Sequence, residues 1–266
     1  MRSANYFHEV NILICRQSRW TKDVSEFHNQ FIDRMLKIPG PLGFEGAICE
    51  PAPEFGFASD GEPYSVAAYN VKGRTRGVKF VGEYHIPDTY GRTGPEQSAK
   101  TYYGHDSLTY RWKLTNKKID YRFALHENLP AVIVAFGGRF TKVDPCYYDQ
   151  AYCAGQHADH EWQIDADGFR AMINPVYNRL QADPAIDVDG WNNIYTLYPA
   201  QYWEGGRCLR ALGYDRDEVI RRLTGKVPLV RPLLDGVYIV LNDNPDITYD
   251  EYYAMNVENK ALLELQ

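Results

Sequence analysis

The side chains best suited to chemistry lie in the middle of the sequence. His157, His160 and Glu161 occur as HADHE, and Asp165 and Asp167 follow closely. Imidazole and carboxylate ligands together suit zinc or manganese, so this cluster could serve a metal-assisted hydrolase. The HExxH order, which places two ligands and a base on one helix face, is absent. The sequence therefore favours a solvated acidic loop without a metal or other cofactor, and a metal-assisted hydrolase is the alternative function.

Two cysteines precede this cluster. Cys146 and Cys153 could face His157 or His160 as a nucleophile beside its base, but no spacing fixes that geometry. Buried cysteine that behaves as a small apolar residue is the stronger interpretation. The chain has 5 cysteines and no C-x-x-C spacing, which predicts free thiols in a reducing, cytoplasmic compartment.

Other catalytic signatures are missing from the sequence. Neither Gly137-Gly138 nor Gly205-Gly206 belongs to a phosphate-binding glycine pattern, and no G-x-S-x-G elbow occurs. We therefore expect a binding protein and not an enzyme.

The formal charge of −6 is spread unevenly. Residues 144–189 contain nine acids and two arginines, and residues 235–266 contain seven acids and one lysine. Acidic surface repels nucleic acid and attracts basic proteins. Between Lys72 and Arg122, eleven basic residues are interleaved with tyrosine and tryptophan, a pattern that could bind single-stranded nucleic acid. Five acids in the same range dilute it, so the sequence argues against a nucleic-acid partner.

The pattern of elements predicts an α+β fold with a mixed or mainly antiparallel sheet, packed by a few helices and built of two similar halves. Strong β-formers, helix caps and turn residues mark the boundaries. The expected strands are Glu9–Cys15, Ser65–Val71, Val78–Ile86, Leu108–Leu114, Tyr121–Leu125, Ala131–Phe136, Trp191–Leu197 and Val237–Leu241. The expected helices are one that begins at Thr21 and is halted by Pro39, then Asp165–Leu180, Asp215–Leu223 and Asp250–Leu263.

In the last of these helices, Tyr253, Val257 and Leu262 are the expected core positions. The whole chain, 1–266, is expected to form one domain, which could divide into subdomains 1–143 and 144–266. No apolar run reaches the roughly 18 residues of a membrane span, so neither a span nor a signal peptide is expected.

Three short segments resemble the immunity proteins that protect bacteria from type VI secretion and related polymorphic toxins. They are the opening strand and helix (VNILIC to RMLKI), Asp189-Gly190-Trp191 with Leu197-Tyr198-Pro199, and the ending from Asn244-Pro245 to Leu263. This resemblance implies a cytoplasmic α+β inhibitor without catalytic residues. Such a protein neutralises its cognate toxin by blocking the active site or substrate access.

The residues themselves suggest a partner-binding surface in the acidic segment. Acids that steer association lie among aromatic side chains that can anchor it, and a basic toxin surface would match them. The candidate residues are Tyr147, Tyr148, Asp149, Tyr152, Asp159, Glu161, Trp162, Asp165 and Asp167. The alternative is a solubilising face whose aromatic residues pack inward. The C-terminal acids remain a second candidate for the interface.

Overall fold

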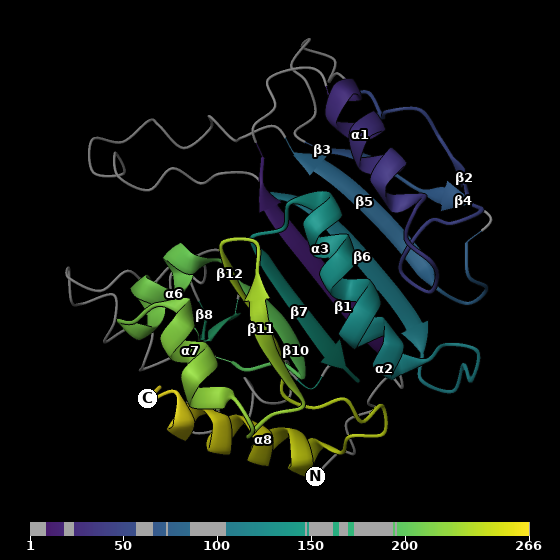
Figure 1. Cartoon of the computed structure of the whole chain (residues 1–266). Helices are drawn as coiled ribbons and strands as arrows, with labels where there is room; N and C mark the ends of the chain where they lie inside the picture. Colours follow the sequence, from purple (N-terminus) through teal and green to yellow (C-terminus); the bar gives the residue numbers. More distant parts are fainter. Residues whose placement is uncertain are drawn as a thin grey trace, which may run out of the picture.

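The computed structural model describes residues 9–18, 24–56, 66–72, 74–85, 105–146, 148, 162–164, 170–172, 194 and 196–265. Within these residues, a large antiparallel sheet crosses the molecule and helices pack against it (Figure 1). The predicted α+β class is therefore confirmed.

The large sheet has eight strands in the order β11-β12-β10-β7-β1-β6-β5-β3, and every neighbouring pair is antiparallel. Its strands are β1 (Glu9–Gln17), β3 (Val66–Tyr69), β5 (Lys79–His85), β6 (His105–Lys113), β7 (Phe140–Pro145), β10 (Ala200–Trp203), β11 (Leu229–Leu233) and β12 (Gly236–Val240). Strands from both expected subdomains share this sheet, and β7 itself crosses position 143. Two small sheets pair β2 (Ile48–Cys49) with β4 (Val71–Lys72), and β8 (Trp162–Ile164) with β9 (Arg170–Met172).

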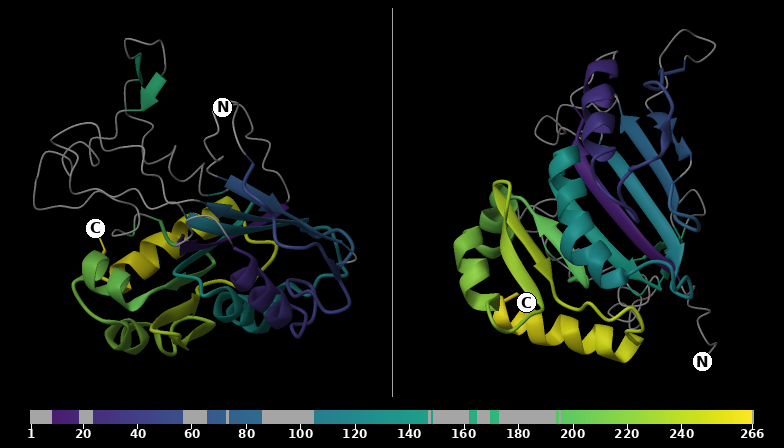
Figure 2. Two further views of the ribbon diagram at one scale, coloured as in Figure 1. Left: turned by 90° about the horizontal axis from the view of Figure 1, so that it is seen from above. Right: turned by 45° about the vertical axis from the view of Figure 1, so that its right-hand side comes forward.

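The helices fall into two groups (Figures 1 and 2). The first group lies in front of the sheet in Figure 1 and comprises α1 (Ser25–Met35), α2 (Tyr121–Phe123), the π-helical turn η1 (Ala124–Asn128) and α3 (Leu129–Phe136). The second group surrounds the β11–β12 end and comprises α6 (Gly205–Leu212), α7 (Arg216–Leu223) and α8 (Tyr249–Leu262).

Two hydrophobic cores lie on opposite faces of the sheet. On β12, Tyr238 and Val240 belong to the first core, whereas Val237 and Ile239 belong to the second. Successive side chains of a strand point to opposite faces, so the two cores are separated by the sheet. The first core packs α1 and α3 against β1, β5 and β6, and the second packs α6, α7 and α8 against β10 and β12. We call the face of β1, β3, β5 and β6 opposite the first core the open sheet face.

The predicted strands Tyr121–Leu125 and Ala131–Phe136 are wrong, because this segment is helical throughout. Asp120 caps it by accepting a hydrogen bond from the Phe123 N–H, and Gly137 ends it in the left-handed conformation. A continuous apolar run does not distinguish a buried strand from a buried helix, and here the first core surrounds α3 on most sides.

Two predictions in the second half also need correction. The helix expected over Asp165–Leu180 is contradicted at Arg170–Met172, which forms strand β9. The strand expected over Trp191–Leu197 is wrong at the described positions 194, 196 and 197, which form no strand, and β10 begins only at Ala200. By contrast, the predicted helices that end at Leu223 and Leu263 and the strand Val237–Leu241 are confirmed to within about a residue at each end.

Candidate partner-binding surface

Most of the predicted partner-binding residues lie outside the described part of the chain. These are Tyr147, Asp149, Tyr152, Asp159, Glu161, Asp165 and Asp167. Trp162 opens strand β8, for which only the backbone is described. The partner surface expected from the acids between Asp149 and Asp167 therefore remains a prediction.

Tyr148 is the one residue of this set whose side chain is described. It lies in the second core at 7% exposure, and its hydroxyl donates to the Ile247 carbonyl oxygen at 3.0 Å. Its ring packs against those of Tyr249 and Tyr252. Tyr148 thus anchors the segment that leads into α8 instead of facing a partner.

The metal-like histidines also fall outside the described residues. His157 and His160 belong to this part of the chain, so the metal-assisted hydrolase is not tested. Among the described residues, no group of three or more His, Cys, Asp or Glu side chains could hold a metal ion.

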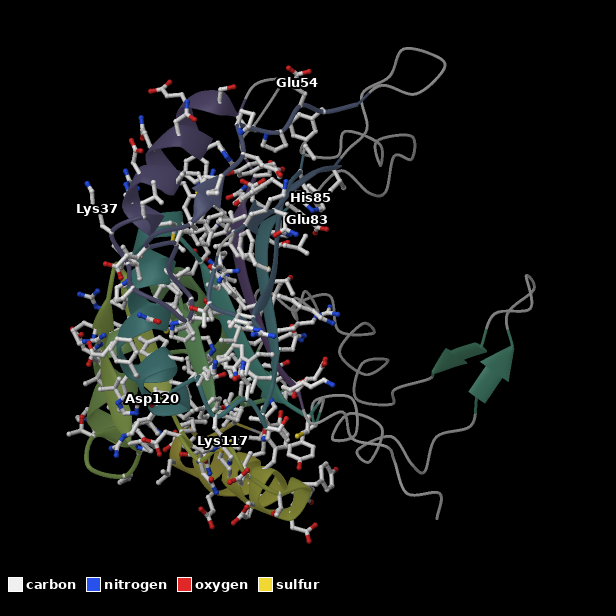
Figure 3. The ribbon with its side chains drawn as sticks, turned by 90° about the vertical axis from the view of Figure 1, so that its right-hand side faces the viewer. Lys37, Glu54, Glu83, His85, Lys117 and Asp120 are labelled. Carbon is white, nitrogen blue, oxygen red and sulfur yellow. The ribbon has the colours of Figure 1, made fainter. Side chains whose placement is uncertain are left out.

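Glu83, His85 and Ser107 form a polar cluster at one end of the open sheet face; Figure 3 labels the first two. The Ser107 hydroxyl donates to Glu83 Oε2 at 3.2 Å, and His85 Nε2 lies 3.8 Å from the same oxygen. The serine and the imidazole therefore share a carboxylate. Ser107 thus lies beside a carboxylate and not beside the imidazole, so this cluster lacks the serine–histidine hydrogen bond of a catalytic triad.

The described cysteines are equally unsuited to act as nucleophiles. Cys15, Cys146 and Cys208 are buried, and Cys49 is partly exposed. Burial raises the pKa of Cys15 and of Cys208 to about 12, and it also raises the pKa of Cys146. The reactive form is the thiolate, which is scarce at these positions at neutral pH.

We expect iodoacetamide to alkylate Cys49 of the native protein well before Cys15 and Cys208, because, of these three thiols, only Cys49 is partly exposed; burial raises the pKa of all three, and those of Cys15 and Cys208 to about 12. Peptide mapping by mass spectrometry, with a urea-unfolded sample as the fully labelled control, measures each site separately. Rapid labelling of Cys15 in the folded protein would contradict the described burial.

The C-terminal helix α8 carries the most partner-like surface of the described residues. Thr248 and Glu251 form a reciprocal capping box at its start. Tyr253 and Val257, one turn apart, are 46% and 51% exposed. They were expected in the core, and this expectation is wrong. Leu262, the third expected core residue, packs partly buried against the second core.

Tyr253 and Val257 are exposed because two buried asparagines occupy part of the inner face of α8. Asn256 and Asn259 are buried beside Tyr252 and Met255, so the inward face is partly polar. Asn256 accepts a hydrogen bond from the Leu197 N–H at 2.8 Å and donates to the Leu197 carbonyl at 2.9 Å. An asparagine that satisfies a buried backbone segment in this way sits in a core at little cost. Apolar spacing alone could not identify this face.

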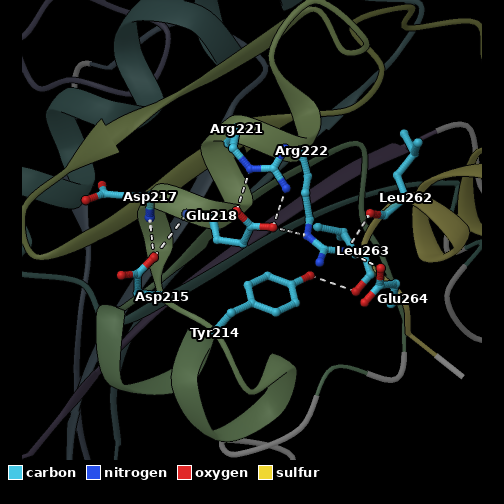
Figure 4. Close-up of polar contacts among 9 residues, drawn as sticks. All are labelled: Tyr214, Asp215, Asp217, Glu218, Arg221, Arg222, Leu262, Leu263 and Glu264. Carbon is cyan, nitrogen blue, oxygen red and sulfur yellow. Dashed lines mark hydrogen bonds and ion pairs between the residues drawn. The ribbon is translucent and has the colours of Figure 1, made fainter.

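The end of α8 is held against α7 by a polar network (Figure 4). Arg222 pairs with Glu218 at 2.8 Å and with Glu264 at 3.0 Å, and Tyr214 donates to the Leu263 carbonyl at 2.7 Å. Both ends of α8 are therefore fixed, and its outer face is presented on a rigid element. Sites on rigid elements bind with less loss of conformational entropy.

The outer face of α8 is acidic. Asp250, Glu251 and Glu258 are exposed beside Tyr253 and Val257. Hydrogen bonds from the backbone and side chain of Thr248 lower the pKa of Glu251, which keeps it charged at neutral pH. No described basic side chain forms an ion pair with Asp250 or Glu258. The result is an apolar stripe with an aromatic ring and a rim of negative charge, the composition of a protein interface.

The fold and this surface define an α+β protein built on an eight-stranded antiparallel sheet with an acidic C-terminal helix. No protein-family model and no curated protein matches the sequence. Among solved structures, the fold is similar to that of the Pseudomonas aeruginosa T6SS protein PA0821. The TM-score is 0.50 at 12% sequence identity, and the match covers 99% of this chain and 76% of that one. At this identity the likeness shows the fold.

Among the described residues, no helix has both the length and the apolar character needed to span a membrane.

Proposed function

We propose that this protein is a cytoplasmic immunity protein that binds a cognate secreted bacterial toxin and neutralises it by blocking its active site or substrate access. The observation that carries this proposal is the α8 surface, where exposed Tyr253 and Val257 lie among Asp250, Glu251 and Glu258. Aromatic anchors bury large apolar areas at low entropic cost, and surrounding acids accelerate the approach of a basic toxin face.

Two further observations support a binding role over catalysis. The similar solved structure is a T6SS protein, and immunity proteins are partners of toxins in such systems. Cys15, Cys146 and Cys208 are buried with raised pKa values, and Ser107 contacts a carboxylate and no imidazole among the described residues. The predicted acidic residues from Tyr147 to Asp167 would add a second region of the same chemistry.

Co-expression with a candidate toxin, chosen from the genes that neighbour this one, tests the proposal directly. We expect the wild-type protein to restore growth of bacteria that produce the toxin, and the purified proteins to form a stable complex. The double variant Tyr253→Ala, Val257→Ala should bind about thirtyfold more weakly, because truncation of an interface anchor costs about 2 kcal/mol or more. Surface plasmon resonance measures the change.

Val134→Ala is the matched control, because Val134 lies on α3 and is 45% exposed, close to the exposure of Val257. It should bind like the wild type, and all variants should melt at similar temperatures. Growth arrest despite co-expression would reject the immunity role. Retained growth with unchanged affinity of the double variant would instead reject the α8 surface alone.

A further inference from the structure

Three basic side chains gather at one end of the open sheet face. Lys79 on β5 lies directly opposite Arg111 on β6 in the strand register, and Lys113 follows Arg111 two residues later on the same face. All three are exposed, and together with Glu9, Gly77, Trp112, Thr115 and Asn116 they line a hollow of about 290 Å³. We call these three residues the sheet cations. They lie at the end of β5 opposite Glu83 and His85, and Lys117 marks their end of the sheet in Figure 3.

The register places two of the sheet cations, Lys79 and Arg111, directly opposite each other. Like charges directly opposite each other on neighbouring strands destabilise a sheet. Glu9 faces Lys113 in the register of β1 and β6, yet no described acid forms an ion pair with any of the three. Among the described residues this basic charge is met by no ion pair, and it suits a ligand of opposite charge.

The aromatic residues of the same strands point the other way. Phe80, Tyr110 and Trp112 alternate with the cations along β5 and β6 and are buried in the first core. In this part of the chain, the basic residues of β5 and β6 therefore lie on one face of the sheet and the aromatic residues lie on the other. Binding of single-stranded nucleic acid requires rings beside the charges as a stacking platform. Trp112 reaches the wall of the hollow but is only 3% exposed, so among the described residues of this face β5 and β6 present no exposed Phe, Tyr or Trp ring.

We infer that the sheet cations bind the carboxylates of an acidic segment in a protein partner. Side chains two residues apart on a strand are separated by about 7 Å, and neighbouring strands by about 5 Å. These spacings match carboxylates presented on one face of an extended acidic segment. The Arg111 guanidinium can hold one of them in a bidentate pair, with the two lysines beside it as point charges.

This surface is distinct from α8 and has the opposite charge. The α8 face is rimmed by acids and fits a basic partner, whereas the sheet cations fit an acidic one. The inference therefore does not depend on the proposed immunity role, and each surface can fail without the other.

Fluorescence anisotropy with a labelled peptide of alternating Glu and Ser, about twelve residues long, tests the inference at low salt. The full-length triple variant Lys79→Gln, Arg111→Gln, Lys113→Gln should bind the peptide about tenfold more weakly, because each exposed ion pair contributes about 0.2–1 kcal/mol. Removing like charges leaves the core untouched, so this variant should melt at the wild-type temperature or slightly above it.

Lys37→Gln is the matched control, because this exposed lysine lies on the α1 side of the molecule (Figure 3). It should bind the peptide like the wild type. Equal losses in the two variants, or no measurable binding by the wild type, would overturn the inference. Tighter binding of a single-stranded DNA oligomer with the same number of charges would overturn it in favour of nucleic acid.

Discussion

Replacement of Asp106 by alanine should lower the free energy of unfolding by about 3–5 kcal/mol, the cost of leaving a buried charge without its partner. Asp106 is fully buried on β6, and its Oδ2 accepts from Arg16 Nε at 2.9 Å. Its Oδ1 accepts from the His85 N–H, also at 2.9 Å. The substitution removes the carboxylate that pairs with the Arg16 guanidinium, which also donates to the Phe136 carbonyl at 3.3 Å and lies over the rings of Phe27 and Phe136. Urea denaturation monitored by circular dichroism measures the change.

The double variant Arg16→Met, Asp106→Ala is the informative control. It should be more stable than Asp106→Ala alone, since it removes the unpaired charge together with its partner. Asp120→Ala, which removes an exposed helix cap, should cost only about 1 kcal/mol. If Asp106→Ala cost no more than Asp120→Ala, the buried pair would not have the described geometry.

Replacement of Asn256 by leucine should lower the free energy of unfolding by about 3 kcal/mol. The substitution leaves the Leu197 N–H and carbonyl without partners inside the second core, and each buried unpaired group costs about 1–3 kcal/mol. Leucine has the branching and heavy-atom count of asparagine but a larger volume, so the loss is compared with that of a second Asn→Leu variant that changes the volume equally. Chemical denaturation again provides the measurement.

Asn259→Leu provides a matched comparison on the same helix. Asn259 is also buried, but its side chain donates only to the Met255 carbonyl one helical turn earlier. Inside a helix that carbonyl already accepts from the backbone, so Asn259→Leu should cost less than about 1 kcal/mol. Equal losses for the two variants would show that Asn256 does not hold the Leu197 segment.

The elements that could be predicted from sequence are those with local signals. Asp215 caps α7 through the N–H groups of Asp217 and Glu218, and the arginines at its end complete a pattern visible without a structure. Strand β1 alternates buried and half-buried residues along most of its length, and its β-formers marked it directly.

The elements that could not be predicted depend on distant contacts. Helix α6 begins with Gly205-Gly206, two poor helix formers, and no helix was expected there from the sequence. A side chain at Gly205 would place its Cβ 2.7 Å from the Asp235 carbonyl oxygen, so close packing against the β11–β12 turn requires glycine there. No local rule reveals such a contact thirty residues away in the chain.

For the candidate surfaces, too, the residue types could be predicted from the sequence, whereas their exposure depends on distant contacts. The acidic character of the C-terminal segment was visible in the sequence, but the exposure of Tyr253 and Val257 depends on Asn256 facing inward. The basic residues of β5 and β6 were visible too. The sequence did not show that these basic residues and the aromatic residues lie on different faces of the sheet. That follows from the pleat of the strands, which places Lys79 and Phe80 on opposite faces.

The central place of β1 has a consequence for the order of events during synthesis. Glu9 pairs with Lys113, and Val10 pairs with Pro145, so the first strand finds both neighbours only after more than a hundred further residues have been made. A nascent chain therefore carries an unpaired apolar strand for much of translation. Large sequence separation between contacts slows folding, and exposed strands of this kind are the segments that chaperones retain.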